Sequence, residues 1–72
     1  MTIVRDPKIL SGEPVVRGTR VPALDVAASV RKGISIERIL EAYPSINRKD
    51  IADCVIFANH WLAHQGKGDK NA

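Results

Sequence analysis

The segment Arg17-Gly18-Thr19-Arg20 concentrates the groups of this chain that can bind an anion. Each guanidinium group can make paired hydrogen bonds to a phosphate or a carboxylate, and the hydroxyl adds another donor. The segment lacks the lysine and the glycine spacing of a nucleotide-binding P-loop. Two interpretations therefore stay open. In the first, Gly18 adopts a turn conformation that other residues resist, and the arginines pair with acids such as Asp25 or with a partner protein. In the second, the arginines contact DNA phosphates.

A second basic pair, Arg48 and Lys49, opens the last expected helix, which is where helix-turn-helix proteins contact DNA. Asp50 and Asp53 follow closely, and carboxylates facing phosphates weaken the electrostatic part of DNA binding. This helix is therefore predicted to bind DNA weakly alone. The basic amino-terminal arm or a second copy of the chain would have to supply the missing affinity.

His60 and His64 are four residues apart, so they share one face of a helix, and Asp53 lies two turns earlier. Two turns are about 10.8 Å of helix axis, which is too far for Asp53 to join the histidines at one ion. We therefore predict no metal site. The sequence also contains no nucleophile beside a base, no evident carboxylate pair and no cofactor loop, so we expect neither an enzyme nor a cofactor.

Composition indicates one small intracellular domain. The 72 residues are enough for a single domain, and a chain this short often depends on a partner subunit to complete its core. The net charge of +3 is compatible with an acidic protein or nucleic-acid partner. A single cysteine, Cys54, fits a reducing compartment. Because no signal peptide or membrane span is evident, we expect a cytoplasmic protein without a membrane partner.

Breaker residues and capping signals predict a mainly α fold of three helices behind a short strand-and-turn arm. Prolines and glycines punctuate residues 1–22, where Ile3-Val4 and Val15-Val16 are the strand candidates of a β-hairpin. Helices are expected over residues 23–32, up to Gly33, and 36–43, with Ser35 as N-cap. The third helix is expected over residues 48–65, with Asn47 as N-cap. The domain would then cover residues 1–66, with a flexible tail over 67–72.

The third helix carries apolar side chains around an unusually wide arc. The core stripe consists of Ile51, Val55, Ala58 and Leu62. The second stripe consists of Cys54, Phe57 and Trp61, and the flank consists of Ala52, Ile56 and Ala63. Such an arc implies burial on more than one side. We predict a protein interface at the second stripe, with Phe57 or Trp61 as anchors. The alternative is that the amino-terminal strands cover this stripe within one subunit.

Two motifs give the chain a family resemblance. They are the run Gly12-Glu13-Pro14-Val15-Val16-Arg17-Gly18-Thr19-Arg20-Val21-Pro22, and Gly33-Ile34-Ser35-Ile36-Glu37-Arg38-Ile39-Leu40 followed by Tyr43-Pro44 and Asp50-Ile51. With these motifs the chain resembles the small prokaryotic family catalogued as domain of unknown function 433. The resemblance implies a homeodomain-like helix-turn-helix fold of VapB-type antitoxins, which are often encoded beside a PIN-like ribonuclease.

The resemblance favours an antitoxin that binds and neutralises a PIN-like ribonuclease toxin as a homodimer and represses its own operon by binding double-stranded DNA. The alternative is a stand-alone dimeric helix-turn-helix transcriptional regulator. The suspected contact residues for the nuclease or DNA are Arg17, Thr19, Arg20, Arg48 and Lys49. Those suspected at the protein interface are Cys54, Phe57 and Trp61.

Overall fold

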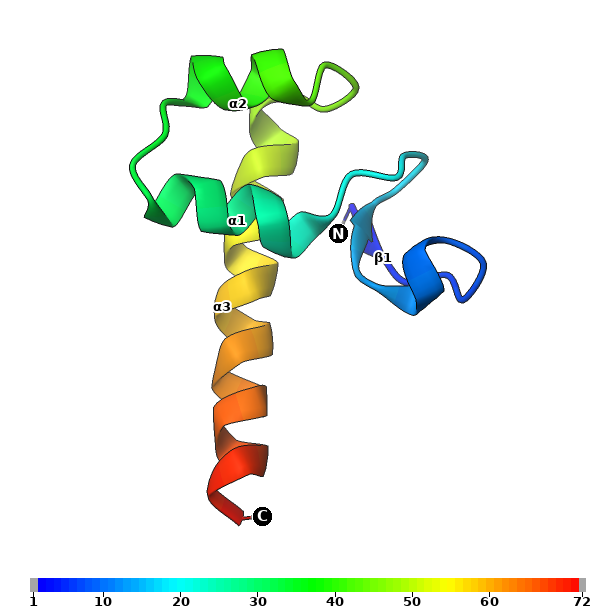
Figure 1. The fold of residues 1–72 in the computed structure, drawn as a ribbon, viewed down its shortest axis with the longest axis vertical. Helices are drawn as coiled ribbons and strands as arrows, with labels where there is room; N and C mark the ends of the chain where they lie inside the picture. The colour runs from blue at the N-terminus through cyan, green and yellow to red at the C-terminus, as the bar shows by residue number, and fades with distance from the viewer. Residues whose placement is uncertain (1, 72) are drawn as a thin grey trace.

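The computed structural model describes the backbone of residues 2–71 and the side chains of residues 2–64. Its elements follow the order β1 (Ile3–Val4), η1 (Leu10–Gly12), β2 (Val15–Val16), α1 (Ala23–Arg31), α2 (Ile36–Ala42) and α3 (Arg48–Asn71) (Figure 1). The strands pair antiparallel, with Ile3 opposite Val16 and Val4 opposite Val15. The predicted mainly α fold, three helices behind a short β-hairpin, is confirmed.

The arm is tied to the start of α1 by backbone hydrogen bonds. The amide of Val16 donates to the carbonyl of Val21 at 3.0 Å, and the amide of Ala23 donates to the carbonyl of Pro14 at 2.9 Å. Figure 1 shows the arm beside the amino-terminal end of α1, on the side away from the loop that joins α1 to α2. These bonds fix the strands as part of the same body as the helices.

The predicted caps of α2 and α3 are confirmed by their hydrogen bonds. The Ser35 hydroxyl accepts from the amide of Arg38 at 3.2 Å, which satisfies one of the free amides at the start of α2. At α3 the bonds are reciprocal: Asn47 Oδ1 accepts from the amide of Asp50 at 2.9 Å, and Asp50 Oδ2 accepts from the amide of Asn47 at 3.0 Å. This is a capping box, and it sets where α3 begins.

The end of α3 differs from the expectation. We predicted that the helix ends near Gln65 because Gly66 follows, whereas α3 continues to Asn71, giving a helix of 24 residues. A glycine inside a helix costs only about 1 kcal/mol relative to alanine, so it does not by itself end one. The side chains of the predicted flexible tail, residues 67–72, lie outside the described residues.

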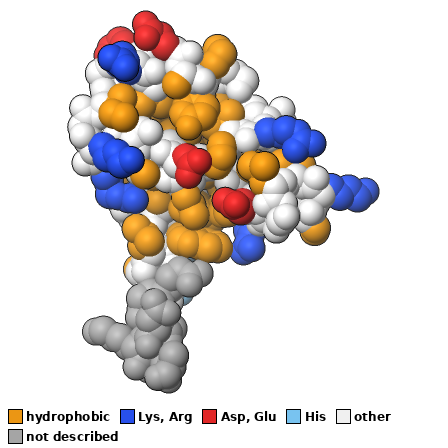
Figure 2. All heavy atoms as spheres, viewed as in Figure 1, with side chains coloured by type: hydrophobic (Ala, Val, Ile, Leu, Met, Phe, Trp, Pro, Cys, Tyr) orange, Lys and Arg blue, Asp and Glu red, His pale blue; other side chains and the backbone are white. Residues whose placement is uncertain are grey.

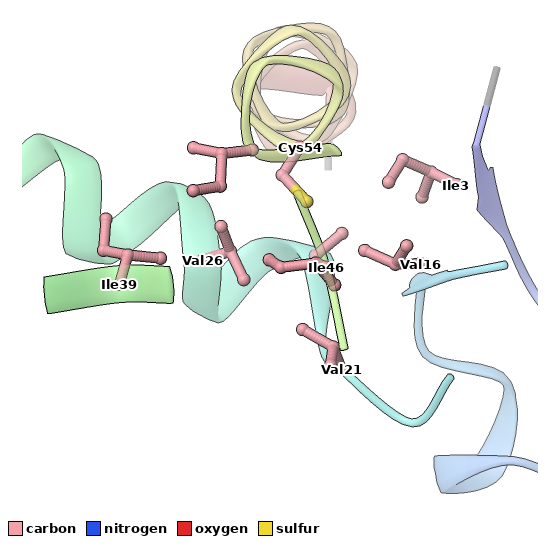
Figure 3. Packing of buried hydrophobic residues seen from close by; sticks show 9 residues of the cluster. Ile3, Val16, Val21, Val26, Ile39, Ile46 and Cys54 are labelled. Carbon is pink, nitrogen blue, oxygen red and sulfur yellow. The ribbon is translucent and has the colours of Figure 1, made fainter. Parts of the chain in front are cut away.

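A compact apolar cluster joins all three helices to the arm. Its buried members are Ile3, Val16, Val21, Ala23, Val26, Ile39, Ile46, Ile51 and Cys54. Figure 3 shows the sulfur of Cys54 pointing from α3 toward Val26 and Ile46, with Ile3 and Val16 approaching from the arm. The amino-terminal half of α3 is therefore the centre of the fold, packed on α1 on one side and on β1 on another.

The burial of Cys54 predicts an unreactive thiol. Its side chain is 0% exposed, and loss of hydration raises its pKa to about 11, with Asp50 and Asp53 adding a smaller effect of the same sign. A rise of two units from 9.0 lowers the thiolate fraction at pH 8 by about 100-fold, and only the thiolate attacks alkylating reagents. Iodoacetamide at pH 8 is therefore expected to label Cys54 at least about 100-fold more slowly in the native protein than in urea. Equal labelling rates of Cys54 in the native protein and in urea, measured by mass spectrometry, would contradict the burial of this thiol.

Candidate functional site

The arginine turn, residues 17–20, is a tight loop held by hydrogen bonds within the chain. The amide of Thr19 donates to the carbonyl of Val16 at 3.0 Å, which closes a four-residue turn. Gly18 has φ of +78°, in the left-handed region that glycine enters without a steric penalty. The expectation that Gly18 forms a turn that other residues resist is confirmed.

Thr19 serves this turn with its side chain. Its hydroxyl donates to the carbonyl of Val16 at 2.8 Å and accepts from the amide of Val21 at 3.0 Å. Both partners belong to the same loop, so the hydroxyl is already engaged within the chain. Thr19 therefore positions the turn, and its contact role beside Arg17 and Arg20 stays a prediction.

Arg17 and Arg20 are exposed on either side of this fixed turn. The amide of Arg17 donates to the carbonyl of Thr2 at 2.6 Å, so its backbone is held by the arm. Within the described part of the chain, no ion pair joins Arg20 to Asp25, which leaves the predicted structural pairing of these two residues without support. The turn thus holds Arg17 and Arg20 on a backbone that is already ordered.

A shallow hollow brings the arginine turn next to the turn between α2 and α3. Ile9, Gly18, Thr19, Arg20 and Ser45 line it, and Ser45 precedes the cap of α3 by two residues. In Figure 1 the two loops leave the helices on the same side of the molecule. The arginine turn, a predicted contact segment, therefore lies next to the turn that precedes α3.

Arg48 and Lys49 are exposed at the amino-terminal end of α3. Arg48 Nη2 lies 3.2 Å from Glu37 Oε2, and both side chains face solvent. The pKa of Glu37 lies below its ordinary value, chiefly because its carboxylate accepts a backbone hydrogen bond and secondly because Arg48 donates to it. Exposed pairs of this kind contribute little to stability, because water screens both charges. Arg48 can therefore exchange Glu37 for a phosphate at little cost.

The second apolar stripe of α3 is used largely within the chain. Cys54 is fully buried, so its expected place at a protein interface is wrong: the arm and α1 cover that side of the helix. The rings of Phe57 and Trp61 are half-buried and stack with their centroids 5.8 Å apart. The guanidinium of Arg5 lies 5.1 Å from the Trp61 ring, and Thr2 Oγ1 donates to Asp53 Oδ2 at 2.8 Å. These contacts favour the alternative that the arm covers this stripe.

The exposed apolar surface of α3 lies on a different face. Leu62, which we predicted in the core stripe, is 50% exposed, and Ile56 is 57% exposed. We define the outer strip of α3 as Ala52, Val55, Ile56, Asn59, Leu62 and Ala63. On the face drawn in Figure 2, apolar side chains also gather over α1 and where α3 emerges beneath it. The arm thus hides one side of the apolar arc and leaves another uncovered.

Two further observations bear on the expected function. Among the described residues, no group of three or more His, Cys, Asp or Glu side chains is placed to hold a metal ion. None of the helices, over the residues that the structure describes, combines the length and the apolar character that crossing a bilayer requires.

Comparison with known proteins gives a family and one uncharacterised relative. The family model described as "Protein of unknown function (DUF433)" matches residues 3–58, which contain the arginine turn and the first half of α3. "Uncharacterized protein y4eO" of Sinorhizobium fredii (strain NBRC 101917 / NGR234) is 55% identical over 56 residues, covering 78% of this chain and 25% of that protein. This chain therefore spans about a quarter of the length of that curated relative. No solved structure matches.

Proposed function

Since this chain belongs to the DUF433 family, we propose that it is the antitoxin of a type II toxin–antitoxin pair. It acts in the cytoplasm as a homodimer that binds and neutralises a PIN-like ribonuclease toxin. The observation that carries this proposal is the arginine turn, which presents Arg17 and Arg20 from a backbone that hydrogen bonds already hold. The family resemblance described above supplies the class of partner.

The chemistry of the turn suits the acidic, metal-binding centre of such a nuclease. Guanidinium groups bind carboxylates through paired, charge-assisted hydrogen bonds, which are among the strongest hydrogen bonds in proteins. A loop that is ordered before it binds also loses little conformational entropy on association. Arg17 and Arg20 would therefore occupy the acidic centre and keep RNA out of it, so the chain inhibits by binding and performs no catalytic step.

Charge reversal at the turn tests this function. Arg20→Glu is expected to weaken binding to the nuclease encoded beside this chain by at least about 10-fold, or about 1.4 kcal/mol, because like charges then face each other. The matched control is Arg31→Glu, which makes the same charge change at the exposed end of α1. Titration calorimetry and inhibition of RNA cleavage measure the effect. If Arg20→Glu, Arg31→Glu and the wild type bind the nuclease equally well, the arginine turn is not part of the nuclease-binding surface.

A second candidate, a stand-alone dimeric transcriptional regulator, is favoured by one observation. The α2–turn–α3 unit exposes Arg48 and Lys49 at the amino-terminal end of α3, and Ser45 of its turn lines the hollow that contains Arg20. Helix-turn-helix proteins contact the major groove with this end of the second helix of the motif. Salt dependence separates the candidates, because binding through phosphates falls steeply as salt increases. If the chain binds its upstream DNA in a salt-sensitive way and does not bind the nuclease, the regulator is favoured. An antitoxin that represses its own operon would bind both this DNA and the nuclease.

A further inference from the structure

The turn at residues 9–12, here called the leucine turn, has a backbone conformation that its residue types disfavour. Leu10 has φ of +49° and Ser11 has φ of +57°, and no other residue except glycine has positive φ in the part of the chain that the structure describes. The amide of Gly12 donates to the carbonyl of Ile9 at 3.0 Å, so these are the two central residues of a closed turn. Asparagine, aspartate and glycine usually hold such positions, because a larger side chain crowds the next carbonyl oxygen there. A leucine in this conformation therefore lowers the stability of the free chain.

Contacts from neighbouring segments hold the leucine turn in this conformation. The amide of Glu13 donates to the carbonyl of Leu10 at 3.1 Å, which adds a second closing bond. Arg5 Nε donates to the carbonyl of Gly12 at 2.7 Å, and the same guanidinium lies 5.1 Å from the Trp61 ring of α3. Strained residues persist where the surrounding structure fixes them, and they gather at ligand-binding and switch segments. The leucine turn is therefore a candidate binding segment.

The leucine turn places an apolar side chain next to the arginine turn. Leu10 is 39% exposed, and the residue before it, Ile9, lines the same hollow as Arg20. Consecutive Cα atoms are about 3.8 Å apart, so Leu10 follows directly on the wall of this hollow. A single exposed leucine is common on a protein surface. An exposed leucine that is held in a strained conformation beside a predicted contact segment is not, and it calls for a role in binding.

We propose that Leu10 is the apolar anchor of the contact with the nuclease, where it enters an apolar recess beside the carboxylates that bind Arg20. This inference rests on the proposed function and adds to it a residue on which the affinity depends. Apolar anchors of this kind fill a recess of the partner, and the contacts around them keep water out. Because the turn fixes Leu10 before association, its side chain loses little conformational freedom on binding.

The charges around the leucine turn favour an acidic protein over a second copy of this chain or DNA. Residues 5–20 contain four cations and two acids, which are Arg5, Lys8, Arg17, Arg20, Asp6 and Glu13. Asp6 Oδ1 already accepts from the amide of Lys8 at 2.9 Å. Two copies of this surface would place like charges opposite each other, which weakens an interface. A DNA backbone would match the arginines but would leave Leu10 against charged phosphates.

Leu10→Asn tests the anchor while keeping the turn, because asparagine tolerates the left-handed conformation. It is expected to raise the Kd for the nuclease encoded beside this chain by at least about 10-fold, measured by titration calorimetry. Ile34→Asn is the matched control, since Ile34 is 42% exposed and lies in the loop between α1 and α2, away from the arm (Figure 1). We expect Ile34→Asn to bind like the wild type. Leu10→Met keeps the apolar volume and is expected to stay within about 3-fold of the wild type.

Three outcomes of this titration would overturn the inference. If Leu10→Asn binds as tightly as the wild type while Arg20→Glu binds weakly, Leu10 lies outside the contact and the proposed function still stands. If the wild-type chain does not bind the nuclease, the proposed function fails together with the inference. If Leu10→Asn instead lowers the mass found by sedimentation and leaves nuclease binding unchanged, a second copy of the chain covers Leu10.

Ser11→Gly tests the strain without the nuclease. Glycine enters the left-handed region without a steric penalty, so the thermal unfolding midpoint is expected to increase by about 3 °C. Ser29→Gly is the control, because the same change inside α1 is expected to lower the midpoint. Ser11→Gly should bind the nuclease within about 3-fold of the wild type, since Leu10 keeps its place. A midpoint that falls in both variants would show that the leucine turn is unstrained and would contradict the inference.

Discussion

Replacing Ile39 with alanine is expected to lower the free energy of unfolding by about 3 kcal/mol, within the range of about 2 to 5 for buried isoleucine. Ile39 is 2% exposed and is the one buried residue of α2, among residues the structure describes. It is the buried anchor of the short α2 in the cluster shared with α1 and α3, against which Ile36 and Leu40 also pack. Small domains have a total stability of about 5 to 15 kcal/mol, so much of this protein's stability would be lost.

Urea unfolding followed by circular dichroism measures the effect of Ile39→Ala. Ile34→Ala is the control, because it removes the same atoms from a side chain that is 42% exposed, and we expect it to cost less than half as much. A loss below about 1 kcal/mol for Ile39→Ala would mean that α2 is not held as the structure indicates.

The second large effect is expected at Thr19. Thr19→Val keeps the shape of the side chain but removes the hydroxyl, so the amide of Val21 loses its acceptor, at a cost of about 1 to 3 kcal/mol. Thr19→Ser retains the hydroxyl and is expected to cost well under half of that. Because the turn also holds Arg20 in place, Thr19→Val should weaken nuclease binding as well. Thermal unfolding that does not distinguish valine from serine would show that these hydrogen bonds contribute little.

Local chemistry made the helix boundaries predictable. Ser35 and the Asn47–Asp50 pair satisfy free amides a few residues away, and these bonds need no information about the rest of the fold. Gly33 likewise follows α1 where we expected the helix to stop, and its φ of +84° lies in the left-handed region that glycine adopts at helix ends. Caps act over one turn of helix, which is why a sequence read alone places them correctly.

The rotation of α3 was not predictable in the same way. An apolar arc this wide leaves several stripes able to face α1, and the choice depends on what the arm and α1 bring to it. The arm reaches Asp53 and Trp61, which turns Cys54 into the core and Leu62 outward. The packing of the arm and α1 therefore decides which stripe of α3 faces the core, which helical periodicity alone left open.

The positioning role of Thr19 also escaped the sequence. Thr19 was singled out because its hydroxyl stands between two arginines, and only the structure reveals that the hydroxyl bonds to Val16 and Val21 within the loop. These hydrogen bonds depend on how the chain turns at Gly18, which a list of residue types does not contain.

The mass of the wild-type chain in dilute solution tests most directly whether this protein is the homodimer of the proposed function. Sedimentation equilibrium is expected to give a species of twice the 7.9 kDa chain mass at micromolar concentrations and reversible dissociation on dilution. A constant 7.9 kDa up to several hundred micromolar, with Ile56 and Leu62 in contact with water, would contradict the account.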